Sequence, residues 1–318
     1  MENLAKLLEE NFIYPKIGKS YANMLLSKMT SGAYSKFGSA EEFAKVVTAD
    51  LQSIHPEGHL KLFPPSTPTS VNSAAENVNP IRGIGKAGWL APRVAYMSIH
   101  GFTGAPEEIT RLRKILNDFS TAKILIIDGR FYDGGGLRET DLMFSYFFDK
   151  PTTIIQMDTR LDVEQRGGSF LIESETLKRI AAPEGIVRRE QVAIPSEKKT
   201  NLMKAQIFLL TSKKTASGGE HFSLAMKRTG RATLIGEKTA GAGHFGRTRD
   251  LGGGYRAFIP IGRPFDPDTG KGWEQTGVEP HIKVPAEKAL DEALRRARVN
   301  PSAARNALKS FKIDQSPH

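Results

Sequence analysis

Apolar residues recur at helical spacing in three stretches near the start of the chain, over residues 2–12, 18–30 and 40–54. The third stretch follows Ser39 and Glu42, a pair with the form of a capping box, and its apolar side chains Phe43, Val46, Val47 and Leu51 share one face. We therefore predict an N-terminal helical domain over residues 1–62. Residues 63–92 are rich in Pro, Ser, Asn and Gly without periodicity, and this composition predicts a linker or loop.

Strand and helix patterns alternate from residue 93 onward. Strands are expected at 93–99, 123–128, 206–210 and 232–235, and helices at 106–119, 137–148 and 217–229. Alternation at this spacing predicts an α/β core, with helices packed against a sheet, over residues 93–298. Later elements are a strand near 254–261 and a helix near 285–298. The polar stretch 156–204 is interpreted as a lid, and residues 299–318 as a weakly ordered C-terminal tail.

Composition narrows the class of protein. The chain has 318 residues, enough for about two domains. It has no cysteine, which excludes disulfides, a cysteine nucleophile and a thiolate zinc site. The net charge of +10 comes from basic residues interspersed with acidic ones, which indicates a mixed solvated surface and no nucleic-acid partner. No apolar run is long enough for an integral membrane segment. Acidic residues interrupt the first dozen positions, so the expected location is cytoplasmic, or periplasmic or secreted for a processed form.

Two glycine-rich turns carry the candidate chemistry. Ser217 lies between a predicted strand and a predicted helix, where the amides of Gly218 and Gly219 could donate to an oxyanion. The alternative is that Ser217 only caps the helix, with Glu220 completing a capping box. The stretch 128–136 follows another predicted strand, and its Gly134 or Gly135 could supply a second oxyanion donor or merely form a tight turn.

The segments 211–220, 230–241 and 273–280, with 128–135 and 58–60, resemble motifs of one serine peptidase family. It is the family of C-terminal processing, or tail-specific, proteases, which also contains the tricorn core and interphotoreceptor retinoid-binding proteins. The motifs occur in the family's order over residues 10–290, and the chain is most similar to the branch without a PDZ module. The resemblance implies a Clp protease/crotonase-like α/β core with an N-terminal helical bundle. It also implies a serine-type peptidase acting on peptides or unfolded proteins.

The same resemblance assigns site residues. The nucleophile falls on Ser217, and Gly218, Gly134 and Gly135 are candidates for the oxyanion hole. At the position of the lysine base of the processing proteases stands Ala242, and Lys238 lies four positions too early, so no lysine dyad is expected. The tricorn branch uses a histidine and a glutamate that match His59 and Glu274. A histidine base could exchange a proton with the serine while the carboxylate fixes its tautomer. Gly58 replaces the serine that precedes the histidine in the tricorn pattern.

Other interpretations remain. The main alternative is a non-catalytic, retinoid-binding-protein-like ligand binder on the same fold, and another is an acyl-CoA enzyme of the crotonase type. His55 and His59 have metal-ligand spacing but lack a third ligand, so no metal and no cofactor are expected. His221 should point along its helix away from Ser217, and His100, His244 and His281 are expected on the surface or along a substrate channel. A homo-oligomer is possible.

Overall fold

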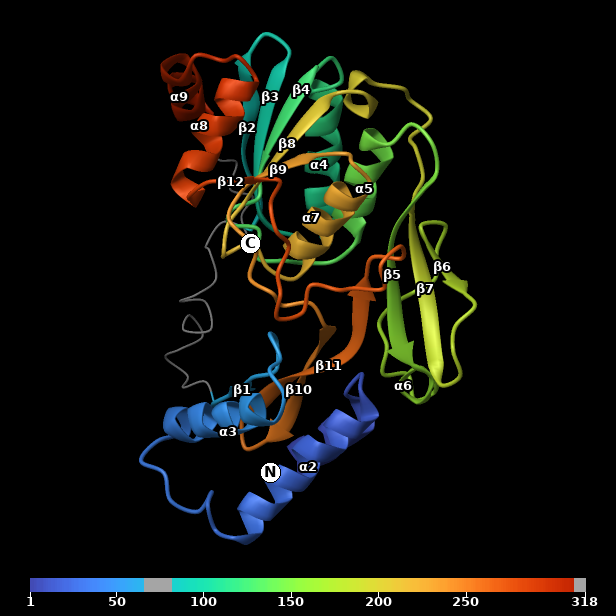
Figure 1. Cartoon of the computed structure of the whole chain (residues 1–318), viewed down its shortest axis with the longest axis vertical. Helices are drawn as coiled ribbons and strands as arrows, with labels where there is room; N and C mark the ends of the chain where they lie inside the picture. Colours follow the sequence, from blue (N-terminus) through green and yellow to red (C-terminus); the bar gives the residue numbers. More distant parts are fainter. Residues whose placement is uncertain (66–81, 312–318) are drawn as a thin grey trace.

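The computed structural model describes residues 1–65 and 82–311 (Figure 1). Three helices come first: α1 (Glu2–Asn11), α2 (Pro15–Thr30) and α3 (Ala40–Ile54). They confirm the three predicted helices, although α2 begins earlier, because Pro15 occupies a first-turn position that needs no backbone donor. The Ser39 hydroxyl caps α3 by accepting a hydrogen bond from the Glu42 amide at 3.1 Å.

The α/β core is built on a six-stranded sheet. Its strand order is β12 (Ile282–Lys283), β9 (Thr233–Gly236), β8 (Gln206–Thr211), β4 (Ile124–Asp128), β3 (Val94–Gly101) and β2 (Gly83–Ala91). The first five strands are parallel, and β2 pairs with β3 in the antiparallel sense at the edge. The predicted core strands are therefore confirmed. The linker prediction is wrong for β2, because the glycines and Lys86 of this segment interrupt the apolar pattern expected of a strand. Residues 66–81 of the predicted linker lie outside the described residues.

Helices cover both faces of this sheet (Figure 1). On one face lie α4 (Pro106–Asp118), α5 (Arg138–Phe147) and α7 (Gly218–Arg228), and on the other α8 (Ala289–Arg296) and α9 (Pro301–Ser310). Alternate strand residues serve the two cores: Leu209 faces the first, whereas Phe208 and Leu210 face the second. Helix α9 corrects the prediction of a weakly ordered tail for residues 301–310, whereas residues 312–318 of that tail lie outside the described residues. Asn300 caps the helix, and Ala304 is fully buried against α8, so the segment is an ordered part of the fold.

A second, antiparallel sheet follows the order β1 (Leu62–Phe63), β11 (Tyr255–Phe265), β5 (Thr152–Arg160), β7 (Ile186–Ala193) and β6 (Leu177–Ile180), and β10 (Phe245–Gly252) also pairs with β11. The predicted lid region therefore contains strands β5, β6 and β7, the short helix α6 (Leu161–Gln165) and a 3₁₀ turn, η2 (Asn201–Met203). Another 3₁₀ turn, η3 (Ala286–Lys288), precedes α8.

Strand β11 connects the N-terminal helices to the rest of the molecule. Its first half pairs with β1 and β10 and its second half with β5. Ala257, Ile259 and Ile261 on β11 bury their side chains in one core with Leu4 and Leu8 of α1. This packing brings the turn that follows α3 next to the loop between β9 and β10 (Figure 1). Among the described residues, no helix combines the length and apolar character needed to cross a bilayer.

Candidate active site

Ser217 has an unusual backbone conformation. It precedes the first residue of α7 with φ +53° and ψ −118°, a region that side chains other than glycine rarely enter. Such a conformation costs of order 1–3 kcal/mol and persists only where the surroundings enforce it. Ala216 donates a backbone hydrogen bond to the Tyr132 carbonyl at 3.0 Å, and the Thr215 hydroxyl donates to the Gly129 carbonyl at 2.7 Å. The turn after β8 is thus fastened to the turn after β4.

Glu220, which is completely buried, fixes the serine from the other side. Its carboxylate accepts hydrogen bonds from the Ser217 amide at 3.0 Å, the Thr239 hydroxyl at 2.6 Å, the Gly241 amide at 2.6 Å and the Ala242 amide at 2.8 Å. The Glu220 contact expected of a capping box is therefore present. The same side chain also links the Ser217 turn to the 239–242 loop, which a simple cap would not do.

Glycines surround the serine hydroxyl. A Cβ on Gly134 would lie 2.9 Å from the Ser217 Cβ, and a Cβ on Gly218 would lie 2.7 Å from the Gly135 carbonyl oxygen. Gly134 and Gly135 also have φ values of +133° and +127°, which favour glycine. The backbone hydrogen bonds of the described residues include none donated by the amides of Gly134, Gly135 or Gly218. The structure therefore brings together Ser217 and the three predicted oxyanion glycines.

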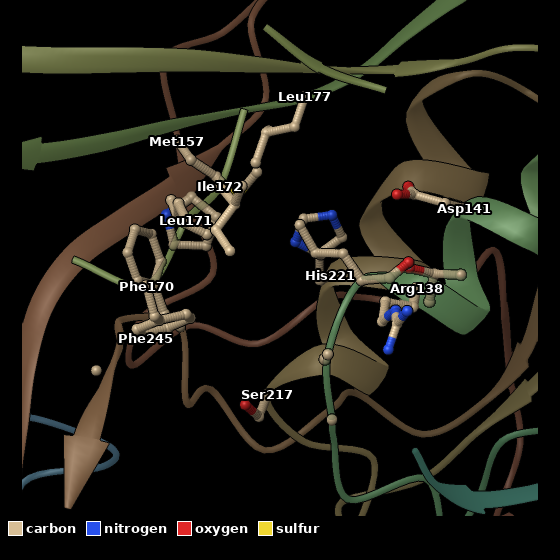
Figure 2. A pocket seen from close by; sticks show the side chains of 18 of the residues that line it. Arg138, Asp141, Met157, Phe170, Leu171, Ile172, Leu177, Ser217, His221 and Phe245 are labelled. Atoms are coloured by element: carbon tan, nitrogen blue, oxygen red, sulfur yellow. The ribbon is translucent and has the colours of Figure 1, made fainter. Parts of the chain in front are cut away.

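Ser217 opens onto a pocket of about 660 Å³. Figure 2 shows Ser217 at the tip of its helix, with apolar side chains on one side of the cavity and His221, Arg138 and Asp141 on the other. The apolar side consists of Met157, Phe170, Leu171, Ile172, Leu177 and Phe245. Residues 170–172 belong to the stretch predicted as a lid, so part of that stretch does line the pocket. Ile172 is 82% exposed at its rim.

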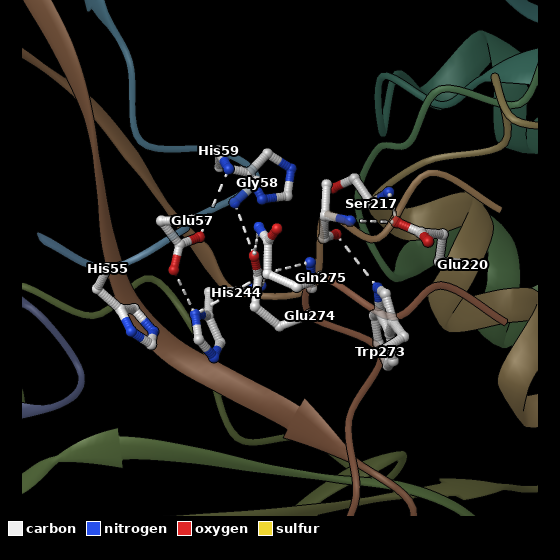
Figure 3. Close-up of polar contacts among 12 residues, drawn as sticks. His55, Glu57, Gly58, His59, Ser217, Glu220, His244, Trp273, Glu274 and Gln275 are labelled. Atoms are coloured by element: carbon white, nitrogen blue, oxygen red, sulfur yellow. Dashed lines mark hydrogen bonds and ion pairs between the residues drawn. The ribbon is translucent and has the colours of Figure 1, made fainter. Parts of the chain in front are cut away.

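His59 lies in the turn after α3. Its ring stacks on Phe258 of β11, with centroids 5.0 Å apart, and its buried Nδ1 atom has no hydrogen-bond partner. Burial lowers the pKa of His59, and the negative charge of Glu274 only partly opposes that effect. The imidazole is therefore neutral at neutral pH. No hydrogen bond between His59 and Ser217 occurs among the described residues, and Figure 3 shows the two side chains in the same region without a bond between them.

Glu274 binds backbone amides rather than the His59 ring. Its carboxylate accepts from Gly58 at 2.6 Å, Gly243 at 2.6 Å and His244 at 3.0 Å (Figure 3). Burial alone would raise its pKa, but the hydrogen bonds from the Gln275 side chain and from these amides outweigh burial and lower it. Glu274 is therefore an anion that holds the turn carrying His59 against the 243–244 loop.

Gly58 leaves no room for a side chain. A Cβ there would lie 2.7 Å from the Ala242 Cα and 2.9 Å from the Gly241 carbonyl oxygen. In this conformation position 58 can therefore contribute only its backbone amide. Gly58, which replaces the serine of the tricorn pattern, therefore allows the backbone of its turn to approach the backbone of residues 241–242 closely.

The sequence did not single out Glu57, and it did not indicate that His244 would be its partner. Glu57 is 1% exposed, and its carboxylate lies 2.6 Å from the His244 Nδ1 atom. The prediction that His244 lies on the surface or in a substrate channel needs correction. It is 4% exposed beneath Phe12 and Tyr14, although it lines a second, smaller pocket. No motif signalled this pair, because its members are 187 residues apart.

The remaining candidates fall outside the reacting centre. Lys238 is exposed. His221 is buried, and its Nε2 atom lies 2.6 Å from the Gln191 side-chain oxygen, so it is already paired within the pocket wall. Burial lowers its pKa to about 4. His281 is exposed and accepts a hydrogen bond from the Leu234 amide.

Within the described part of the chain, Glu57, His244 and Glu274 are the residues close enough together to be considered as a metal site, because one possible ligand atom from each lies within 4.8 Å of the others. The 2.6 Å contact between Glu57 and His244 is a hydrogen-bond distance. Two atoms bound to one zinc ion at about 2.0–2.2 Å in tetrahedral geometry lie more than about 3 Å apart. This arrangement therefore fits a hydrogen-bonded pair rather than a metal site.

Comparisons with known proteins agree with this architecture. Similar solved structures include a lipoprotein from Streptococcus agalactiae, with a TM-score of 0.59 at 16% identity over 93% of this chain and 94% of that chain. The photosystem II D1 C-terminal processing protease gives a TM-score of 0.56 at 12% identity, over 94% and 96% of the two chains. The tricorn protease gives 0.53 at 15% identity, over 97% of this chain and 36% of that chain. These likenesses confirm the predicted α/β fold with an N-terminal helical region.

Sequence comparison with protein families gives two matches. Residues 1–84 match the N-terminal domain found in family S41 peptidases of the eukaryotic interphotoreceptor retinoid-binding protein (IRBP) type. Residues 93–284, more than half of the chain, match peptidase family S41 itself. Together with the two-sheet fold and the glycine-lined turn at Ser217, these matches show that the chain belongs to peptidase family S41.

Proposed function

We propose that the protein is a serine-type peptidase that cleaves peptide bonds through an acyl-enzyme. The observation that carries this proposal is the enforced positive φ of Ser217 at a helix N-terminus, facing the glycine turn 134–135. A strained serine between a buried strand and a helix exposes its hydroxyl at the sheet edge, which is the arrangement a nucleophile needs. A helix cap alone requires neither the strain nor the facing glycines.

In the proposed mechanism, the Ser217 Oγ attacks the carbonyl carbon of the scissile bond as His59 accepts the serine proton. The amides of Gly218 and of Gly134 or Gly135 donate hydrogen bonds to the resulting oxyanion. The tetrahedral intermediate then expels the amine, which takes its proton from His59. A water molecule attacks the acyl-enzyme with His59 again as the base, and Ser217 is regenerated. No metal or cofactor takes part in these steps.

Two features support His59 as the base. Its lowered pKa keeps the ring neutral near pH 7, ready to accept a proton. Phe258 also restrains the ring plane. Catalytic hydrogen bonds are often long before substrate binds, so the open His59–Ser217 contact is compatible with this role. Glu274 assists through its charge and through the Gly58 amide, in place of a direct bond to the imidazole.

The pocket beside Ser217 supports a peptide substrate. Its apolar wall provides a surface for an uncharged side chain of the substrate next to the scissile bond. Two of the polar groups on the opposite wall are already paired. Asp141 accepts from the Gln191 side chain at 2.6 Å and from the Thr176 hydroxyl at 2.8 Å, and His221 contacts Gln191. Arg138 on the same wall is exposed and donates to the Gly104 carbonyl at 3.0 Å, so its positive charge remains available to an acidic group of the substrate. Peptides or unfolded proteins with exposed apolar residues are the expected substrates.

Labelling with a fluorophosphonate tests the nucleophile. The wild-type protein should be labelled on Ser217 and should hydrolyse an unfolded protein such as casein. Ser217→Ala should lose labelling and at least about a thousandfold in hydrolysis while remaining folded, because only the attacking oxygen is removed. Ser302→Ala, an exposed serine at the start of α9, is the matched control and should behave as wild type. A folded wild-type protein with neither labelling nor hydrolysis would favour the ligand-binding interpretation.

A further inference from the structure

The turn that carries His59 meets the core loop 241–244 along two edges. On the backbone edge, Glu274 bridges the amides of Gly58, Gly243 and His244. On the side-chain edge, the Glu57 carboxylate lies 2.6 Å from the Nδ1 atom of the His244 imidazole. Figure 3 shows Glu57 on the side of the turn away from Ser217, with His244 beneath it.

The Glu57 contact is buried and directional. Glu57 and His244 are 1% and 4% exposed, so water cannot replace either partner at low cost. Burial raises the pKa of Glu57, and the hydrogen bond and charge of His244 act against that rise. Without the imidazole, the carboxyl group would be left in an apolar setting, and the turn would have to move to hydrate it.

The same turn is held from within the N-terminal helices. The Gln52 side chain accepts from the Glu57 amide at 2.9 Å and donates to the carbonyls of Glu57 at 2.8 Å and Leu60 at 3.0 Å. His244, in contrast, belongs to the core loop, and its ring packs edge-on against Tyr14, with centroids 5.5 Å apart. The Glu57–His244 bond is thus a link between two side chains, one in the part of the chain that holds His59 and one in the part that holds Ser217.

A chain of hydrogen bonds continues from this loop to the nucleophile. The Ala242 amide, two residues before His244, donates to Glu220, and Glu220 also accepts from the Ser217 amide. Because Gly58 cannot carry a side chain in this conformation, position 58 offers no alternative side-chain link. A displacement of the 57–59 turn would change the position of His59 relative to Ser217, and besides the Gly58–Glu274 bond the Glu57–His244 contact opposes such a displacement from the core side.

We propose that His244 is a positioning residue: through its hydrogen bond to Glu57 it holds the turn that presents His59 to Ser217. This inference rests on the proposed function of Ser217 and His59. His244 does not exchange a proton with the substrate. It keeps the base within reach of the nucleophile, so its loss should slow acylation and leave substrate binding largely unchanged.

The first test compares two substitutions at one position. His244→Ala removes the bond to Glu57, whereas His244→Asn places a side-chain N–H near the former Nδ1 position and can restore it. We expect His244→Ala to slow fluorophosphonate labelling at least about tenfold, since small misplacements of catalytic groups carry large rate penalties, and His244→Asn to recover most of the loss. In peptide hydrolysis, kcat should fall while KM changes less than about twofold. His55→Ala, in the same segment but outside the network, is the control.

A second readout does not depend on activity. In a Ser217→Ala background, the pKa of His59 can be followed by NMR of ¹⁵N-labelled histidines. Burial is the main cause that lowers the pKa of His59; Glu274 opposes it and the charge of the His244 side chain adds to it. His244→Ala removes the contribution of that side chain and lets water reach the ring, so the pKa of His59 should rise toward the reference value of about 6.5. His244→Asn should raise it less, because the turn stays in place.

The outcomes separate the two levels of the proposal. Wild-type protein without labelling would reject the proposed function, while the NMR titration would still test the positioning. An unchanged labelling rate and an unchanged His59 pKa in folded His244→Ala would overturn the positioning role. So would an Asn variant as slow as the Ala variant. Labelling that survives His59→Ala but not His244→Ala would make His244 the base and overturn both assignments of role.

Discussion

Glu220→Gln tests whether the conformation of the Ser217 turn depends on one buried carboxylate. Each oxygen of Glu220 accepts two hydrogen bonds: one oxygen from Thr239 and Gly241, the other from Ser217 and Ala242. A glutamine has one oxygen, so in either orientation its NH₂ group faces two former donors. Two hydrogen bonds to a charged acceptor, each contributing about 1.5–3 kcal/mol, are lost. The neutral amide also removes the cost of burying a charge, which leaves a destabilisation of about 3–5 kcal/mol.

Urea unfolding followed by circular dichroism measures this change in the free energy of unfolding from the midpoint and slope. Glu279→Gln, on an exposed glutamate, is the matched control and should unfold like the wild type. Where Glu220→Gln remains folded, fluorophosphonate labelling should slow, because the Ser217 amide has lost its anchor. A loss of less than about 1 kcal/mol, with a normal labelling rate, would refute the claim that this carboxylate enforces the serine conformation.

Three further predictions concern the remaining groups. His59→Ala should abolish hydrolysis, and the wild-type rate should rise with pH through a midpoint below 6.5, because only the neutral imidazole accepts a proton and burial lowers its pKa. A midpoint above 7 would contradict this, and so would hydrolysis by His59→Ala that is lost when Lys238 is also replaced. Gly134→Ala should slow labelling about a hundredfold or more, whereas Gly136→Ala, where a Cβ meets nothing within 4 Å, should label normally; equal rates would remove the 134 turn from the oxyanion site. Glu274→Gln should slow labelling at least about tenfold in folded protein, and an unchanged rate would exclude its charge from the mechanism.

Local signals were enough to predict the α/β core and the Ser217 turn. Strands β4 and β8 are parallel neighbours, so the turns that follow them meet at the same sheet edge. This is why Gly134 and Gly135 could be paired with Ser217 from sequence. The sequence did not reveal strands β5, β6 and β7 within residues 156–204 or helix α9 within residues 299–318, for a different reason. Strand β7 buries Arg189 as an ion pair with Glu164, so its pattern appears polar, and α9 buries little besides Ala304.

The positions of Glu57 and His244 could not be predicted in this way. Their contact depends on how the N-terminal helices pack on β11, and no periodicity in either segment encodes that packing. The family resemblance indicated His59 and Glu274 as candidates. It did not indicate that Glu274 would bind the backbone of Gly58, because that contact follows from the close approach of two loops.

Strand β11 and the loop before it lie late in the chain, yet the turn carrying His59 is held against them. During synthesis, the first sixty residues leave the ribosome long before Phe258 and Glu274 have been made. Under the proposed assignment, a nascent chain holds the base and, later, the nucleophile without any means of bringing them together. Long-range contacts of this kind form late in folding. Under that assignment, the unfinished polypeptide is therefore unable to cleave neighbouring chains on the polysome, because the order in which its own residues appear keeps the site incomplete.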